Sequence, residues 1–432
     1  MSTQILKAPK ALSPSFISDE KPFKLEEARA QIESEPNHNW FSKRIRKTVI
    51  GHFHQLRNIR IQLIEGQHQH LLGQGANKRV ELRVHNQRFF HKVAHGGCLG
   101  AAQSYIDGDW DCDSLFDLFT AFASDQNSID SLEKGSHFMQ KILSLQDFRH
   151  RNTLKGSKKN IAAHYDLGND FFKLFLDPTL CYSSGIFPTS SSTLEEASLA
   201  KMDRICSELN LNAHDHIMEI GTGWGGFAIY AAAKYGCRVT TTTISKEQYD
   251  IAKSRIAAAG LEDRITLLLK DYRELDGEYN HIVSIEMIEA VGHQYYKEYF
   301  QKIDQLLKPG GKALIQAILI PDYRYDQHLK SLDFIQHSIF PGSTIPSLGA
   351  LLKSSASRSK LTISDVFDMT EDYALTMRHW QNNFRRNIDK ISNLGYPQSF
   401  LRMWTYYLDY CAAGFATRYN SVAQITFTSP AH

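Results

Sequence analysis

Between residues 217 and 320, short apolar segments alternate with longer helical segments, and this alternation leaves few folds open to the chain. The expected strands are Ile217–Ile220, Val239–Ile244, Ile265–Leu269, Ile282–Ile285 and Ala313–Ile320, and the expected helices lie near Phe227–Tyr235, Lys246–Ala259 and Tyr296–Leu307. Lys308–Gly311 is expected to stop the last helix and to turn tightly into the next strand. Short apolar strands joined by helices specify an α/β domain with a parallel, doubly wound sheet. Its ligand should lie at the carboxyl ends of the strands.

A glycine-rich turn, Glu219-Ile-Gly221-Thr-Gly223-Trp-Gly225-Gly226, follows the first of these strands and opens a helix. Glycine permits positive φ and close approach of a ligand, and a helix N-terminus presents unpaired N–H groups. An acid precedes the glycines and the second strand ends without one, which is not the dinucleotide pattern. The turn suits S-adenosylmethionine, with Glu219 orienting the backbone. A tight turn of purely structural importance is the alternative.

The composition argues against several classes of partner. The 432 residues include 49 Lys and Arg against 47 Asp and Glu, and this balance does not favour nucleic acid. The longest apolar runs reach about half of the ~20 residues that span a bilayer, and the start has no secretory signal pattern. The cysteines lack CxxC spacing, and the His52/His54 and His68/His70 pairs lack a third ligand at a suggestive spacing. We therefore expect a cytoplasmic protein with no metal site.

The sequence suggests four parts. Residues 1–35 are polar and carry prolines, as in a leader that need not be ordered. Residues 36–123 contain short apolar runs followed by a helical pattern, which is typical of a small α+β domain. Residues 124–160 become basic and predict a linker or lid that could contact an anionic membrane surface. Residues 161–432 contain the predicted sheet.

Long sequence blocks surround the glycine-rich turn. They are HYDLGNDFFKLFLDPTLCYSSGIF from His164, EIGTGWGGFA from Glu219, TISKEQ from Thr243, DYREL from Asp271, VSIEMIEAVG from Val283 and YYLDYCAAGF from Tyr406. With these blocks the chain resembles the cyclopropane-fatty-acyl-phospholipid synthase family of S-adenosylmethionine-dependent enzymes, from about Gly96 to Phe427. The resemblance implies a Rossmann-like S-adenosylmethionine methyltransferase fold for residues 161–432, which would be the catalytic domain.

The resemblance also implies a set of cofactor contacts. Tyr182 and Ser183 would contact the amino-acid end of S-adenosylmethionine above Gly221 and Gly223; Thr243, Ile244 and Gln248 would face the ribose and adenosine side, and Asp271 and Tyr272 the adenine. For the two tyrosines, core packing is the alternative.

The family's proton acceptor is a bound bicarbonate held by four side chains, and the resemblance places those positions at Ser184, Glu289, Gln316 and Gln381. Glu289 is retained, whereas the other three positions differ from the usual cysteine, histidine and tyrosine. Serine and glutamine still donate hydrogen bonds, so neutral donors could hold an anion. Ser183-Ser184, Gln316, the Glu286/Glu289 pair and the IFPGSTIPSL block from Ile339 resemble the plant-type branch of the family.

Glu286 and Glu289 lie three residues apart just beyond the fourth predicted strand. Two carboxylates on one helical turn can face one site and raise each other's pKa, which suits a proton acceptor. Stabilisation of a helix start is the alternative for one of them. Bicarbonate, Glu289 and Glu286 therefore all remain candidates for the base.

The resemblance implies one-carbon transfer from S-adenosylmethionine to the cis double bond of unsaturated phospholipid acyl chains, giving a cyclopropane fatty acid. Methylene- or methyl-branched products are the close alternative. A small-molecule N- or O-methyltransferase and a catalytically silent lipid-binding protein are the rivals from other classes. The expected setting is the cytoplasm with transient binding to the inner membrane face, and the resemblance leaves a homodimer open.

Overall fold

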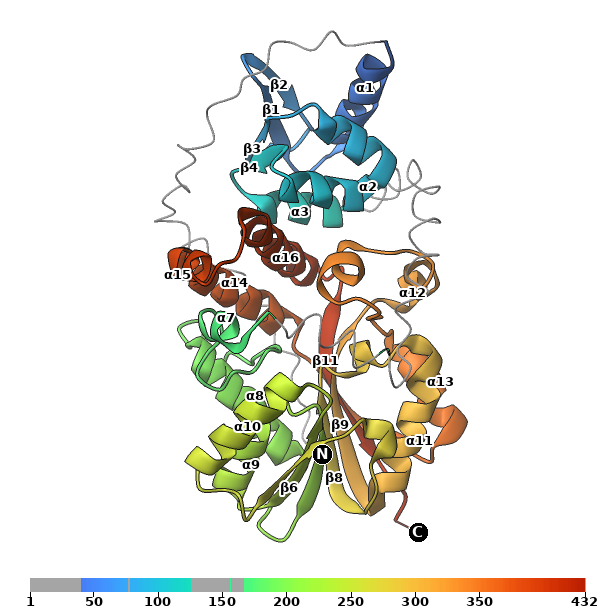
Figure 1. Ribbon diagram of the computed structural model, residues 1–432. Coiled ribbons are helices and arrows are strands. Elements are labelled where there is room, and N and C mark those ends of the chain that lie inside the picture. The colour runs from blue at the N-terminus through green and yellow to red at the C-terminus, as the bar shows by residue number, and fades with distance from the viewer. Residues whose placement is uncertain (1–39, 77, 126–155, 157–166, 432) are drawn as a thin grey trace. The chain divides into compact units, whose positions relative to one another are not determined.

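The computed structural model describes residues 40–76, 78–125, 156 and 167–431 (Figure 1). The predicted leader 1–35 and most of the predicted basic segment 124–160 lie outside the described residues. Arg44–His432 forms one compact unit, and Met1–Lys43 is grouped apart from it. The described residues of the two predicted domains, from Arg44 onward, therefore fall in the same compact unit. Among the described helices, none is both long enough and apolar enough to cross a membrane.

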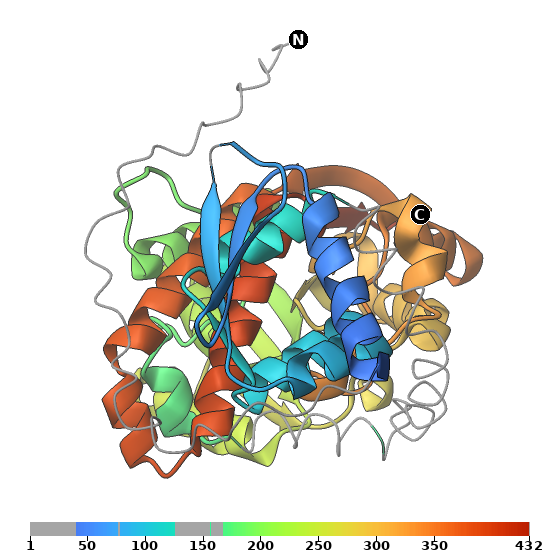
Figure 2. The same ribbon diagram turned by 90° about the horizontal axis from the view of Figure 1, so that it is seen from above.

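The predicted small α+β domain contains a four-stranded sheet with the order β2-β1-β3-β4. Its strands are β1 (Arg60–Glu65), β2 (His68–Leu72), β3 (Arg79–Val84) and β4 (Trp110–Cys112), and its helices are α1 (Trp40–Gln55), α2 (Arg88–Ile106) and α3 (Leu115–Ala123). Figure 2 shows α1 alongside this sheet. Ile45, Val49 and Phe53 on α1 are buried in the same apolar cluster as Ile61 and Leu63 on β1, which explains this packing.

The predicted doubly wound sheet is confirmed, with seven strands in the order β10-β11-β9-β8-β5-β6-β7. The strands are β5 (His216–Ile220), β6 (Arg238–Thr243), β7 (Ile265–Leu269), β8 (Tyr279–Ile285), β9 (Leu307–Leu319), β10 (Thr362–Asp368) and β11 (Ser421–Thr428). The five from β9 to β7 are parallel, and β11 runs antiparallel to both of its neighbours. After β5, the chain adds β6 and β7 on one side of β5, and it then returns to add β8 on the other side of β5. This reversal creates a switch point, where such sheets bind ligands.

Helices cover both faces of the large sheet (Figure 1). The helices of this part of the chain are α7 (Asn169–Lys173), α8 (Leu194–Glu208), α9 (Gly226–Tyr235), α10 (Lys246–Ala258), α11 (Tyr296–Leu306), α12 (Asp322–His328), α13 (Leu348–Arg358), α14 (Thr370–Arg386), α15 (Ile388–Asn393) and α16 (Gln398–Ala416). The α8, α9 and α10 helices pack on one face, and α11 and α13 on the other. Short 3-10 helices occur at Tyr272–Glu274, Ile288–Ala290 and His293–Tyr295, and a π-helix at Ile335–Ile339.

One sequence prediction about the sheet is wrong, and two of its strands were not predicted. The tight turn expected at Lys308–Gly311 belongs to β9, which starts at Leu307 and contains a register shift against β8. Gly310 adopts a positive φ of 74° there, and its N–H is bonded to Pro430 O at 3.0 Å, so the irregularity is a bulge with a paired backbone. The strands β10 and β11 were not anticipated. Polar Gln424 and Thr426 interrupt β11 although both are buried, so β11 lacks a continuous apolar run.

Candidate active site

A cavity of about 410 Å³ lies at the carboxyl ends of β5, β6 and β8. All ten residues predicted to bind the cofactor line it: Tyr182, Ser183, Glu219, Gly221, Gly223, Thr243, Ile244, Gln248, Asp271 and Tyr272. They span ninety residues, from Tyr182 to Tyr272. Those from Glu219 onward come together because the parallel strands β5, β6 and β7 end at the same edge of the sheet. Glu286 and Glu289 line the same cavity, whereas Ser184, Gln316 and Gln381 are not among its lining residues.

The glycine-rich turn forms the floor of the cavity between β5 and α9. Gly221 and Gly223 have positive φ values of 104° and 52°, which side chains rarely adopt. A Cβ atom at Gly221 would lie 3.3 Å from Met287 Cγ, so a larger residue would also crowd the segment after β8. The turn can therefore present bare backbone to a ligand, as S-adenosylmethionine requires.

Glu219 lies under this turn and is held by a chain of hydroxyl groups. Its Oε2 accepts a hydrogen bond from Thr241 Oγ1 at 2.6 Å, and Thr241 Oγ1 lies 2.7 Å from Thr222 Oγ1. Because Thr241 uses its one proton on Glu219, Thr222 must donate to Thr241. Burial raises the pKa of Glu219 to about 8. Thr222 also lines the cavity, and its position between two glycines was the signal that the sequence reasoning passed over.

The predicted adenosine side is also organised by local hydrogen bonds. Thr243 Oγ1 donates to Gln248 Oε1 at 2.8 Å, which fixes the end of β6 to α10. Asp271 accepts two hydrogen bonds of 2.8 Å from the guanidinium group of Arg273. Arg273 also lines the cavity, and the sequence analysis did not predict it. The buried Tyr272 hydroxyl has no hydrogen-bond partner in the part of the chain that the structure describes. An orphaned hydroxyl in a cavity wall fits a polar ligand, so these residues are compatible with an adenosine group.

A buried lysine supports the predicted amino-acid end. Lys201 on α8 is fully buried, and its Nζ donates to Ser183 Oγ at 2.6 Å. The Ser183 hydroxyl proton can then point to another acceptor, such as a ligand carboxylate. The sequence carried a signal for this residue, because Ala197, Lys201 and Ile205 share one helix face that is otherwise apolar.

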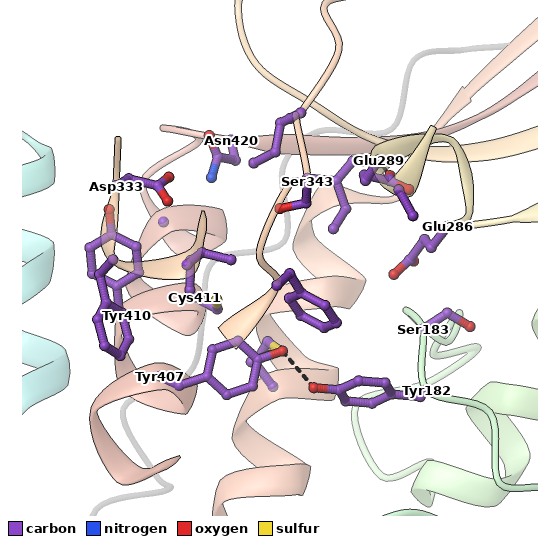
Figure 3. A pocket seen from close by; sticks show the side chains of 18 of the residues that line it. Tyr182, Ser183, Glu286, Glu289, Asp333, Ser343, Tyr407, Tyr410, Cys411 and Asn420 are labelled. Carbon is purple, nitrogen blue, oxygen red and sulfur yellow. Dashed lines mark hydrogen bonds between the residues drawn. The ribbon is translucent and has the colours of Figure 1, made fainter. Parts of the chain in front are cut away.

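Glu286 and Glu289 lie side by side at the end of the cavity away from Asp333 and Tyr410 (Figure 3). Glu286 follows β8 with a positive φ of 48°, which is rare for a residue with a side chain and marks a strained position. Burial raises the pKa of Glu286, although donors from Tyr373, Ser184 and Gln316 oppose the shift. Burial, and then the charge of Glu286, raise the pKa of Glu289 to about 8. The predicted rise in pKa caused by the neighbouring carboxylate therefore occurs at Glu289, through the charge of Glu286. At Glu286 it is burial that raises the pKa.

The three donors predicted to hold bicarbonate are engaged with other partners. Ser184 donates its N–H to Glu286 Oε1 at 2.9 Å and its hydroxyl to Gly185 O at 3.0 Å. Gln316 Nε2 donates to Glu286 Oε1 at 2.7 Å. The Gln381 amide donates to Asp409 on α16, outside the cavity lining. The structure therefore gathers Ser184 and Gln316 around Glu286 rather than around an open anion site, and it does not bring Gln381 to them.

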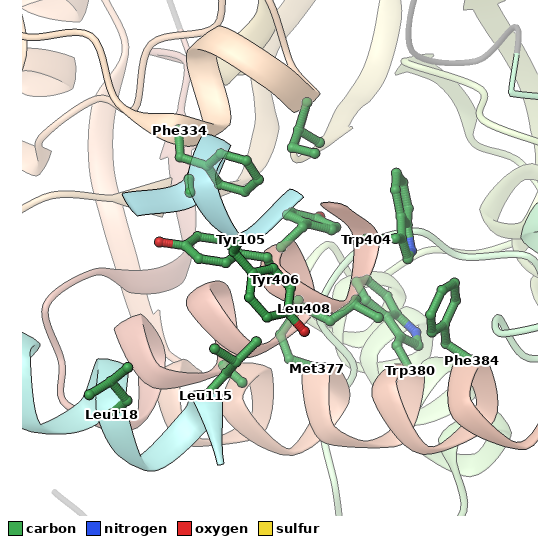
Figure 4. Close-up of a cluster of buried hydrophobic side chains, with 14 of the residues drawn as sticks. Tyr105, Leu115, Leu118, Phe334, Met377, Trp380, Phe384, Trp404, Tyr406 and Leu408 are labelled. Carbon is green, nitrogen blue, oxygen red and sulfur yellow. The ribbon is translucent and has the colours of Figure 1, made fainter. Parts of the chain in front are cut away.

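The far wall of the cavity is apolar and aromatic. Tyr407 and Tyr410 of α16 are both lining residues, and the Tyr407 hydroxyl lies 2.8 Å from that of Tyr182 (Figure 3). Phe89, Leu118, Phe119 and Phe122 of the small domain line the same cavity. These side chains approach because α16 lies between α3 and α14 (Figure 1), in a shared core that includes Leu118, Met377 and Tyr406 (Figure 4). Such a wall can enclose a hydrocarbon chain.

Comparisons with known proteins identify the family of the chain. Residues 152–425 match the family model described as mycolic acid cyclopropane synthetase. The chain is 37% identical to the tuberculostearic acid methyltransferase UfaA1 of Mycobacterium tuberculosis, over 78% of this chain and 80% of that protein. It is 35% identical to the cyclopropane-fatty-acyl-phospholipid synthase of Escherichia coli K12, over 81% of this chain and 88% of that protein.

A solved structure of a related enzyme has a fold similar to that of this chain. The mycolic acid cyclopropane synthase CmaA1, complexed with SAH and CTAB, superposes with a TM-score of 0.59 and 30% identity, covering 63% of this chain and 98% of that one. The family model covers more than half of the sequence, and the sequence relatives extend over most of it. The chain belongs to the mycolic acid cyclopropane synthetase family.

Proposed function

We propose that this protein transfers a one-carbon unit from S-adenosylmethionine to the cis double bond of an unsaturated phospholipid acyl chain and closes a cyclopropane ring. One observation carries the proposal. A single cavity joins the glycine-rich turn to an aromatic hydrocarbon wall, and the buried Glu286 and Glu289 carboxylates lie in it. A methyltransferase for small polar acceptors has no need of such a wall.

The donor supplies an electrophilic methyl group on a cationic sulfur. The chain's own residues do the rest: Gly221 and Gly223 let the donor lie on the backbone, and Ser183, supported by Lys201, receives its amino-acid end. An alkene is a weak nucleophile, so its close positioning in a water-free pocket must lower the barrier. Buried side chains in the cavity wall, such as Tyr407, exclude water from this pocket.

Methyl transfer leaves a carbocation on the acyl chain. The faces of Tyr182, Tyr373 and Tyr407, all in the cavity wall, can stabilise it by cation–π interaction. A carboxylate then removes a proton from the new methyl group, and the C–H electron pair closes the ring. Bicarbonate does not enter this proposal, because Ser184, Gln316 and Gln381 donate elsewhere.

A branched product is the second candidate. The relative named tuberculostearic acid methyltransferase is 37% identical to this chain, which is as similar as the phospholipid synthase. Loss of a proton from a neighbouring chain carbon, in place of the methyl group, would give a methyl-branched alkene with the same residues. A methylene product would require a hydride to move from the methyl-bearing carbon to the cation before the methyl group loses its proton.

We further propose that the protein binds transiently to the inner membrane face from the cytoplasm, since an acyl chain in phospholipid must be taken from a bilayer. The basic residues between 141 and 159, which lie outside the described residues, supply charges that suit an anionic surface. A homodimer is part of the same proposal by family resemblance.

The test is product analysis. The protein is incubated with vesicles of cis-unsaturated phosphatidylethanolamine and phosphatidylglycerol and with donor labelled in its methyl carbon. We expect labelled acyl chains that gain one CH₂, lose their olefinic protons and show cyclopropane ring protons by NMR. Labelled chains with retained alkene signals would establish the branched alternative. Unlabelled lipid would overturn the proposal, in favour of a small-molecule methyltransferase if soluble acceptors are labelled, or of a silent lipid-binding protein if none is.

A further inference from the structure

Three hydrogen bonds surround the Glu286 carboxylate. Ser184 N and Gln316 Nε2 donate to its Oε1 at 2.9 and 2.7 Å. The Tyr373 hydroxyl lies 2.7 Å from its Oε2. The backbone agrees with this arrangement, because Glu286 N–H donates to Gln316 O at 2.8 Å. The side chain is therefore fixed at both of its oxygens and at its own peptide group.

The orientation of the Gln316 side-chain amide, which donates to Glu286, is determined by Arg204 through Gln424. Arg204 Nη1 donates to Gln424 Oε1 at 2.6 Å, and a guanidinium can only donate. Gln424 must then use its Nε2 on Gln316 Oε1, at 3.0 Å. Gln316 is left with its Nε2 facing Glu286. This relay from Arg204 forces Oε1 of Glu286 to act as an acceptor, which favours the ionised carboxylate.

Glu289, three residues further along, has a different environment. Its Oε1 accepts a hydrogen bond from Ile318 N–H at 2.6 Å, and backbone N–H groups are its only donors, while its Oε2 is buried with no partner among the described residues. A carboxyl with an orphaned oxygen is poorly stabilised as an anion. Of the Glu286/Glu289 pair, Glu286 is the one whose ionised form receives more hydrogen bonds.

We propose that Glu286 is the proton acceptor of the reaction and that its carboxylate takes the place of bicarbonate in this chain. The inference rests on the proposed function. One C–S bond breaks with its electrons left on sulfur, and the alkene π pair forms the new C–C bond. Glu286 then takes one proton from the methyl group, and the released C–H pair closes the ring. Glu286 becomes a neutral acid and returns the proton to water after product release.

The first measurement varies bicarbonate. Assays of the full chain with unsaturated vesicles and labelled donor are run in buffer freed of CO₂ and with added bicarbonate. We expect the wild-type kcat to change by less than about twofold. Glu286→Gln should lower kcat at least about a hundredfold at every bicarbonate concentration. Glu286→Gly, which opens a hole beside Ser184 N–H and Gln316 Nε2, should regain at least about tenfold on addition of bicarbonate or formate.

The second measurement reads binding without turnover. NMR of ¹³C-bicarbonate should show no broadening with the wild type and concentration-dependent broadening with Glu286→Gly. Unchanged thermal melting and affinity for S-adenosylhomocysteine would show that both variants fold. Arg204→Met tests the relay, since loss of the orienting donor should move the acid limb of the kcat–pH profile to higher pH.

The outcomes separate the two proposals. A wild-type enzyme that makes lipid product but loses activity without bicarbonate would overturn the role of Glu286 and leave the proposed function standing. A Glu286→Gln variant within about threefold of wild type would do the same. If no lipid product forms at any bicarbonate concentration, the proposed function fails, and bicarbonate binding to the wild type would still refute the replacement.

Discussion

The two ends of the cavity are built in different ways. At the cofactor end, most of the lining residues lie at or just beyond the carboxyl ends of strands of one parallel sheet, as Gly221 follows β5 and Thr243 ends β6. At the acyl end, the lining comes from segments that are remote in sequence, such as Leu118 on α3 and Tyr407 on α16. The cofactor end therefore depends on local backbone geometry, whereas the acyl end depends on how the small domain packs against the C-terminal helices. Changes at one end should leave the other intact.

The largest effect should come from Gly221→Val. A side chain there meets both an unfavourable φ of 104° and the Met287 side chain at 3.3 Å from its Cβ. We expect affinity for S-adenosylhomocysteine, measured by calorimetry, to fall at least about a hundredfold, or about 2.7 kcal/mol. Gly260→Ala is the matched control, because Gly260 also has a positive φ, of 66°, with no atom within 4 Å of an added Cβ. Equal loss in both variants would mean that general strain, and not the site, weakens binding.

The next effect is the pH dependence of cofactor binding. Burial raises the pKa of Glu219 to about 8, so near pH 6 the group is mostly neutral. S-adenosylmethionine carries a positive charge on its sulfur, so it should bind more tightly when the Glu219 carboxylate is ionised. Its affinity should rise with pH by up to about tenfold per unit while pH is below this pKa and below that of the donor's amino group. Calorimetry at pH 6 and 7 should show this slope in wild type and its loss in Glu219→Gln. A wild-type slope that persists in the variant would place the titrating group elsewhere.

The same contrast explains what the sequence could predict. The five parallel strands and the glycine-rich turn after Glu219 could be predicted from the sequence, because strand periodicity and glycine spacing are local signals. The other cofactor-side residues, such as Tyr182 and Asp271, were named through the resemblance to the family, and they line the cavity. The donors around Glu286 could not be predicted. Ser184 and Gln316 were expected to face an anion, and nothing in their spacing reveals that Gln424, on the unanticipated strand β11, orients Gln316. Gln381 was assigned by alignment with relatives, yet its partner Asp409 lies on a different helix. Tertiary hydrogen-bond networks of this kind leave no periodic trace.

The smallest effect should come from the acyl end. Leu118 is buried at the cavity wall, and Leu118→Trp adds volume where a hydrocarbon chain would lie. We expect kcat/KM on vesicles to fall about fivefold, and more for longer acyl chains than for shorter ones, while affinity for S-adenosylhomocysteine stays unchanged. Leu71→Trp is the control, because Leu71 is 54% exposed on β2 of the same domain. A loss that is equal for every chain length would mean that the substitution disturbs packing on α16 generally. A loss of cofactor affinity would contradict the independence of the two ends, since it would require the α3–α16 contact to reach the glycine turn through the shared core.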